Sequence, residues 1–259
     1  MVTVADHMLT AKELREPQIK AAVIDELFAS GSIDADTVII SEMPVPSLPR
    51  RADLVVANGS LIGFEIKSDA DKTLRLRGQI EAYRKAFEGT IVVTGAKHLD
   101  EVLDAALDTV GVFVIDEMEN DAPKARMLRK PHIRKLDMEA SIRQMNARDL
   151  YRLARDHDVA GTDEKDRFTL EQRVRCLPLA SVRKSALDAI KLRYLKQFQD
   201  FKHARAARVP TIEALRLLRR PAWNEPNQPA SLSPTVEADE MEPSDFSDFR
   251  LSVTKRRIT

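Results

Sequence analysis

The chain begins with a helical pattern of hydrophobic positions. Between residues 16 and 29, apolar side chains recur every three or four residues and form the stripe Ile19, Val23 and Leu27. Pro17 is tolerated in the first turn of a helix, and Gly31 follows where helices commonly end. The pattern predicts a helix over residues 16–29.

Short apolar runs of strand type follow this helix. Residues 37–43 form one run, and three prolines interrupt the chain before the next. Residues 51–57 and 61–67 are rich in Val, Leu, Ile and Phe, and they flank Asn58-Gly59. Asn-Gly between two such runs is the strongest short-range signal for a β-hairpin, so we predict three strands here.

The pattern then alternates between helix and strand. Asp71 or Thr73 can cap a helix that runs to about residue 88. Its apolar side, which we expect to face the sheet, consists of Leu76, Ile80, Tyr83 and Phe87. A strand over 90–94, a helix over 98–107 and a strand over 111–115 predict a parallel β-α-β crossover.

After residue 120 the pattern becomes helical. Pro123 and Pro131 frame what we interpret as a connector, and the helices are predicted over 138–144, 146–157, 169–176 and 181–204. Residues 221–259 combine five prolines with Ser, Glu and Asp, a composition typical of disorder. We therefore predict an α/β domain over 1–120, a basic helical domain over 121–220 and a disordered tail over 221–259.

The hairpin carries the candidate chemistry. Glu65 and Lys67 lie on one face of their strand, because side chains alternate between faces. A two-residue loop would place Asp53 opposite Phe64, whereas a three-residue loop over 58–60 pairs Asp53 with Glu65. We predict the three-residue loop, or a bulge that restores the same register.

Two facing carboxylates beside a lysine suit a divalent cation and a phosphate. Mg²⁺ prefers oxygen ligands and usually takes one or two carboxylates together with substrate phosphate. Lys67 can hold the attacking water or touch the scissile phosphate. The alternative is that Asp53, Glu65 and Lys67 are only the exposed polar face of a hairpin.

These residues resemble the motif of the PD-(D/E)XK nuclease superfamily. Asp53 matches the first acidic position, Glu65-Ile66-Lys67 matches (D/E)xK, and Gln79 with Tyr83 matches the Q-x-x-x-Y of the RecB and Holliday-junction-resolvase-like branch. Within that branch the chain looks most like a family of uncharacterised bacterial proteins with an EIKSD-type core and a helical C-terminal region. Ala52 stands where the superfamily often has proline.

The resemblance implies a restriction-endonuclease-like αβββαβ core with a mixed sheet. It implies catalytic roles for Asp53, Glu65, Lys67 and Gln79. The metal ligands that it implies are Asp53, Glu65, the carbonyl of Ile66 and an upstream glutamate. Glu42 is one choice for that glutamate, and Glu16 and Glu26 remain open. The cofactor is then Mg²⁺ or Mn²⁺.

Further residues near the motif are candidate substrate contacts. Gln79 and Tyr83 are four residues apart, so both can point along one side of a helix. We expect Gln79 to position Lys67 or contact the substrate backbone, while Tyr83 contacts DNA, supports Gln79 or is simply a core aromatic residue. Arg75 and Arg77 are predicted phosphate contacts.

The charge distribution favours nucleic acid as a partner. The chain is neutral overall, but residues 1–123 carry a net charge of −10 and residues 124–220 carry +13. The basic part includes a series of cations on the last long helix that we predict to contact phosphate: Arg183, Lys184, Lys191, Arg193, Lys196, Lys202, Arg205 and Arg208. Residues 146–177 also faintly resemble a nucleic-acid-binding module of the SAP type.

The sequence therefore predicts a metal-dependent nuclease that acts on DNA. The single Cys176 rules out an intramolecular disulfide and is expected to be buried, and no apolar run approaches 18 residues. These features favour a cytoplasmic protein without membrane partners. A catalytically silent nucleic-acid-binding module is the alternative, as is an interaction protein that binds a protein partner through its helical region or tail. A homodimer is also left open.

Overall fold

The computed structural model describes residues 13–45, 51–116, 122–159 and 166–219. In this part of the chain, one six-stranded sheet has the strand order β1-β2-β3-β4-β5-β6. The strands β3, β4 and β5 are parallel, and every other neighbouring pair is antiparallel. The strands are β1 (Val38–Met43), β2 (Ala52–Asn58), β3 (Ser60–Lys67), β4 (Gly89–Gly95), β5 (Gly111–Asp116) and β6 (Lys124–Arg129).

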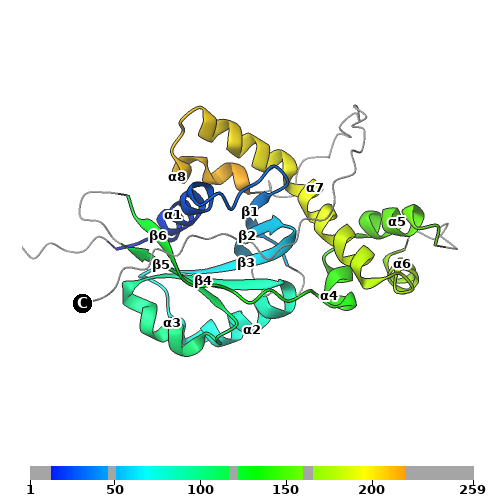
Figure 1. Cartoon of the computed structure of the whole chain (residues 1–259), viewed down its shortest axis with the longest axis horizontal. Helices are drawn as coiled ribbons and strands as arrows, with labels where there is room; N and C mark the ends of the chain where they lie inside the picture. Colours follow the sequence, from blue (N-terminus) through cyan, green and yellow to red (C-terminus); the bar gives the residue numbers. More distant parts are fainter. Residues whose placement is uncertain (1–12, 46–50, 117–121, 160–165, 220–259) are drawn as a thin grey trace, which may run out of the picture.

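Helices cover both faces of the sheet. The helices of more than one turn are α1 (Glu16–Ala29), α2 (Leu76–Ala86), α3 (Leu99–Ala105), α4 (Met138–Arg143), α5 (Ala147–Asp156), α6 (Arg167–Val174) and α7 (Leu179–Ala206), and α8 (Thr211–Ala214) is a single turn. In Figure 1, α1, α8 and one end of α7 lie above the sheet, whereas α2 and α3 lie below it. The helices α4, α5 and α6 gather at the other end of α7, beyond the edge of the sheet.

The predicted α/β class and the αβββαβ order with a mixed sheet are confirmed. The first helix spans residues 16–29 as expected, and the apolar side of α2 is buried. The hairpin register is also confirmed, since Ala57 pairs with Leu61 around the loop 58–60. Gly59, at its centre, has a φ of 58°, which glycine adopts at little cost.

One strand of the sheet was not predicted. We expected a connector between the prolines at 123 and 131, but residues 124–129 form β6, antiparallel to β5. Ala125 and Met127 are buried while Lys124 and Arg126 are exposed, which is the alternation of a half-buried strand. The predicted domain boundary at residue 120 therefore lies inside the sheet.

The long helix α7 joins two hydrophobic cores. Its first half packs in a small helical core through Val182 and Ala186, together with Leu150 and Leu170. Its second half packs against α1 and the sheet through Phe198 and other apolar residues of the main core. The helical region is thus continuous with the sheet domain.

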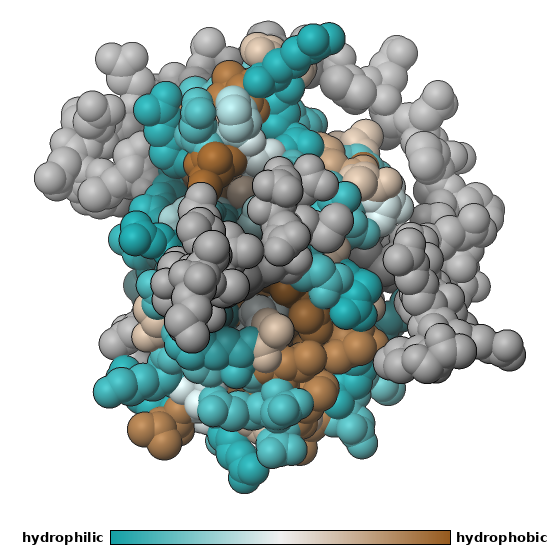
Figure 2. Space-filling model, turned by 90° about the vertical axis from the view of Figure 1, so that its left-hand side faces the viewer, coloured by the Kyte–Doolittle hydropathy of each residue, from teal (hydrophilic) through white to brown (hydrophobic). Residues whose placement is uncertain are grey.

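One surface residue differs from expectation. Cys176 is exposed in the turn that follows the last residue of α6, Val174, so the prediction of burial was wrong. No helix in the described ranges is both long and apolar enough to cross a bilayer. The face in Figure 2 is mainly hydrophilic, and its largest hydrophobic area is in the lower half. The predicted tail lies outside the described residues.

Glu88 is the buried charge that connects these parts. Its side chain, 2% exposed, accepts hydrogen bonds from the backbone N–H groups of Leu61 (3.0 Å) and Leu136 (3.4 Å). Arg183 of α7 forms an ion pair with the same carboxylate and donates to the carbonyl of Gly59 at 2.8 Å. One carboxylate therefore fixes the hairpin, the chain leading to α4 and the long helix.

Replacing Arg183 by methionine should destabilise the protein strongly. The substitution leaves Glu88 buried without its cation, and removal of one partner of such a pair costs about 3 kcal/mol or more. Urea unfolding at neutral pH measures the change in the free energy of unfolding. Lys184→Met is the matched control, because its exposed pair with Asp188 contributes less than about 1 kcal/mol. Equal effects of the two substitutions would contradict the role assigned to Glu88.

Candidate active site

The site lies where β2 and β3 stop pairing. Their hydrogen-bonded register ends at Leu54 opposite Phe64, which places Asp53 across from Glu65. Instead of a continued ladder, Oδ2 of Asp53 accepts the backbone N–H of Ile66 at 2.8 Å. The Asp53 carboxylate is thereby held between the two strands at the point where they separate.

Glu42 reaches the same point from the other side of β2. Ser41 pairs with Leu54 and Met43 pairs with Ala52, so Glu42 is opposite Asp53. Glu42 has a φ of 56°, in the left-handed region that non-glycine residues rarely adopt. Such a conformation costs about 1 kcal/mol or more, and strain of this kind recurs at active sites.

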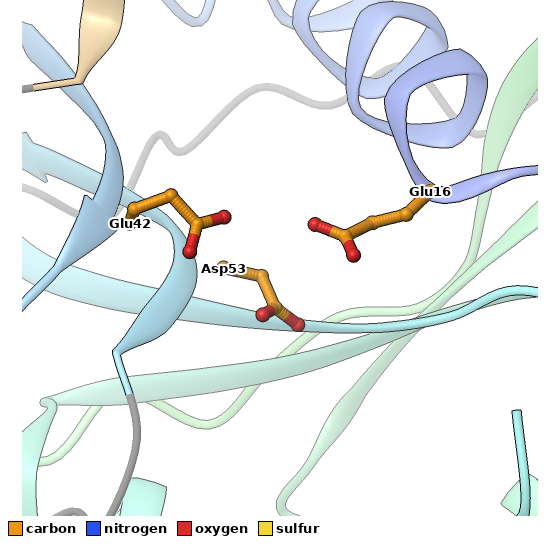
Figure 3. Close-up of side chains that lie close together, drawn as sticks. All are labelled: Glu16, Glu42 and Asp53. Carbon is orange, nitrogen blue, oxygen red and sulfur yellow. The ribbon is translucent and has the colours of Figure 1, made fainter.

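Glu16 completes a cluster of three carboxylates. It comes from the first turn of α1, above the sheet, and one ligand oxygen from each of Glu16, Glu42 and Asp53 lies within 4.8 Å of the others. Figure 3 shows the three side chains pointing toward one another from α1, β1 and β2. Oxygens on opposite sides of a bound Mg²⁺ are about 4 Å apart, so small side-chain movements suffice to bind the ion.

Lys20 neutralises part of this cluster. It lies one helical turn after Glu16 and is 2% exposed. Its ammonium group forms ion pairs with Glu16 at 2.6 Å and with Glu42. A lysine buried to this extent is held by its carboxylate partners, since an unpaired charge would be costly there.

A second group of polar side chains is closed on itself. Nζ of Lys67 donates to Glu65 at 2.9 Å and to Oε1 of Gln79 at 2.8 Å, while Nε2 of Gln79 donates to Glu65 at 2.6 Å. Glu65 and Lys67 are 4% and 5% exposed. The triangle fixes the position of the Lys67 ammonium group beside Glu65, whose charge also acts on Asp53.

Burial and neighbouring charge change the acidity of Asp53. Desolvation is the main cause that raises the pKa of Asp53 to about 8, and the negative charge of Glu65 adds to it. The hydrogen bond from Ile66 and the charge of Lys20 act in the opposite direction. Without a further cation, Asp53 therefore holds a proton at neutral pH.

The structure brings most of the predicted site residues together. Asp53, Glu65, Lys67 and Gln79 converge, and both Glu16 and Glu42 join them. Of the three glutamates considered as the upstream metal ligand, Glu16 and Glu42 belong to the cluster and Glu26 does not. The carbonyl of Ile66 as a ligand stays a prediction.

The predicted substrate contacts include one buried residue and two exposed residues. Tyr83 is 2% exposed, accepts the backbone N–H of Asp53 at 3.2 Å and donates to the carbonyl of Phe64 at 3.5 Å. The prediction that Tyr83 contacts DNA directly was wrong, because this residue is buried beneath the hairpin. Arg75 and Arg77 are exposed at the start of α2, where their phosphate contacts remain predictions.

Six of the eight basic residues predicted to contact phosphate form ion pairs with carboxylates of this chain. The pairs are Arg183–Glu88, Lys184–Asp188, Lys191–Asp36, Arg193–Asp149, Lys196–Asp200 and Arg205–Asp25. Arg183, Lys191, Arg193 and Arg205 are at most 25% exposed in these pairs, so their charge is largely used within the protein. Lys184 and Lys196 are exposed, and their phosphate contacts stay predictions. Lys202 lies over the ring of Phe198, and Arg208 is exposed.

Sequence reasoning missed Lys20. A signal was present, because Lys20 follows Glu16 by four residues and adjoins the apolar stripe that begins at Ile19. A lysine at the margin of a buried helix face needs a partner, and an upstream glutamate of the metal site was the available candidate.

Comparison with known proteins shows that the chain is similar in sequence to a phage protein. A family model described as "Bacteriophage P4 protein cII" matches residues 10–219. Protein cII of Enterobacteria phage P4 is 33% identical over 192 residues, which cover 74% of this chain and 72% of the phage protein. A protein of unknown function from Silicibacter pomeroyi has a TM-score of 0.37 and 22% identity, and the match covers 58% of this chain and 99% of that one.

The raised pKa of Asp53 should make the metal-free protein less stable at alkaline pH. The folded state holds the proton up to about pH 8, whereas an unfolded chain releases it near pH 4. The stabilisation is therefore complete below pH 4 and is lost as the pH rises through 8. Between pH 6 and 9 in EDTA, the melting temperature of the wild type should fall more than that of Asp53→Asn. Parallel curves would show that Asp53 does not titrate as assigned.

Proposed function

This chain belongs to the bacteriophage P4 cII protein family, and we propose that it is a metal-dependent nuclease that hydrolyses phosphodiester bonds in DNA. The observation that carries the proposal is the convergence of Glu16, Glu42 and Asp53 beside the linked side chains of Glu65 and Lys67. The resemblance of these positions to the PD-(D/E)XK motif supports the same conclusion.

The donor set fits Mg²⁺ or Mn²⁺. Carboxylate oxygens are the ligands that these hard cations prefer, and Glu16, Glu42 and Asp53 would hold the ion, with Glu65 adjacent. A bound cation of this kind activates water and neutralises the charge that develops on a phosphodiester. It would also relieve the repulsion between Asp53 and Glu65 that raises the pKa of Asp53.

Lys67 is the residue that we assign to the reacting groups. Glu65 and Gln79 hold its ammonium group, so little reorganisation is required when substrate arrives. From that position Lys67 can hold the attacking water or stabilise the negative charge on the phosphate. Glu65 and Gln79 position Lys67, and Tyr83 supports the backbone of Asp53.

The path of the DNA backbone is suggested by α2. Arg75 precedes Gln79 by four residues and Arg77 by two, and both arginines are exposed. Residues four apart lie on one side of a helix, so Arg75 is placed to extend the site along the substrate. We propose that Arg75 binds a phosphate next to the one that is cut, and that Arg77, which donates to the carbonyl of Asp104 at 3.4 Å, binds one farther along the backbone.

Cleavage of DNA should depend on both the cation and Lys67. We expect wild-type protein to cut at least one member of a panel of linear, circular, single-stranded and branched DNA in Mg²⁺ or Mn²⁺, and not in EDTA. Lys67→Ala should reduce the rate by about 100-fold or more, because a preorganised charge at the reacting phosphate is lost. Asp53→Asn should have a comparable effect.

The matched control is Lys85→Ala. Lys85 is an exposed lysine on the same helix as Gln79, and its removal should leave cleavage unchanged. Retained cutting in Lys67→Ala or Asp53→Asn would overturn the assignment of the site. DNA binding by the wild type without cleavage under any of these conditions would favour a catalytically silent binding module.

A further inference from the structure

Lys20 has no part in the proposed reaction, yet it lies inside the metal site. It is among the largest fully buried side chains in the described part of the protein, on a helix face that is otherwise apolar. Its two carboxylate partners, Glu16 and Glu42, are two of the three candidate metal ligands. A buried ammonium group between metal ligands calls for an explanation in terms of the metal.

The oxygens of the cluster divide into two sets. One oxygen of Glu16 and one of Glu42 bind Lys20, and one oxygen of Asp53 accepts the N–H of Ile66. Within the described residues, the second oxygen of each carboxylate has no donor bonded to it. Three oxygens from three elements remain, which is a suitable protein contribution to one six-coordinate cation.

The formal charge of the site also favours a single divalent cation. Four carboxylates, of Glu16, Glu42, Asp53 and Glu65, face the two buried ammonium groups of Lys20 and Lys67. The guanidinium group of Arg219, which is 56% exposed, lies 3.7 Å from Glu42 as well. With Asp53 ionised, the balance is −2 without Arg219 and −1 with it, so one divalent cation already meets or exceeds the remaining negative charge. Two divalent cations would leave an excess of positive charge next to the ammonium group of Lys20, which is 2% exposed, at a considerable cost.

We propose that the ammonium group of Lys20 takes the place of a second metal ion, so that the site binds one divalent cation per chain. The inference rests on the proposed function, since it concerns the same site. Lys20 is a positioning residue in this account. It holds Glu16 and Glu42 together before the cation arrives, and it excludes a second cation afterwards.

Manganese binding to the full chain tests the proposal without any reaction. Isothermal titration with Mn²⁺ should give one ion per chain for the wild type and for Lys20→Arg, which keeps the charge. Lys20→Met should bind two ions. In the double variant Lys20→Met/Glu42→Gln, which restores the charge balance, the number should return to one.

The spectrum of the Mn²⁺-saturated wild type gives an answer that does not require a folded variant. Electron paramagnetic resonance should show isolated ions, and a spin-coupled pair of ions would overturn the proposal. A count of one for folded Lys20→Met would also overturn it, while leaving the nuclease assignment intact. If the wild type binds no Mn²⁺ at all, both this inference and the metal-dependent function fail.

Discussion

The arrangement of the whole chain depends on one buried carboxylate. Glu88 follows α2 at the start of β4, and its side chain accepts hydrogen bonds from β3, from the segment before α4 and from α7. Its backbone also donates to Leu61 and accepts from Arg134. A buried charge is tolerated only when it is paired and fully hydrogen-bonded, so each of these segments must be in place before Glu88 is compensated. The constraint makes the helical region an extension of the sheet rather than an appendage.

The candidate site shows the opposite balance of charge. Around Glu88 a single carboxylate meets a guanidinium group and two backbone donors. Around Asp53, four carboxylates meet two lysines and the half-exposed Arg219. The chain accepts further costs there, including the left-handed backbone of Glu42 and the proton held by Asp53. If these residues served stability alone, replacing them by neutral residues of similar size would often make the protein more stable. The contrast within one protein is the physical reason for regarding the acidic cluster as functional.

Sequence reasoning succeeded where local rules decide the structure. The register that places Asp53 across from Glu65 follows from side-chain alternation and the length of the loop at Gly59, and α1 follows from its apolar spacing. Sequence reasoning failed where contacts between residues far apart in the sequence determine the structure. The two prolines hid β6, although Ala125 and Met127 alternate with charged residues as in any edge strand. The ion pairs of the half-buried cations of α7 were not foreseen, because carboxylate partners such as Asp36 and Asp25 are far away in the sequence.

The helix α2 links the two halves of the site. Gln79 contacts the side chains of Glu65 and Lys67, and one turn later Tyr83 contacts the backbone of Asp53 and Phe64. Both residues project from one rigid element, so a shift of α2 would move the lysine and the central carboxylate together. The opposite wall, Glu16 and Lys20, is carried by α1 on the other face of the sheet. The geometry of the cluster is therefore set by how two helices pack on the sheet, and core substitutions beneath either helix act on the site without touching it.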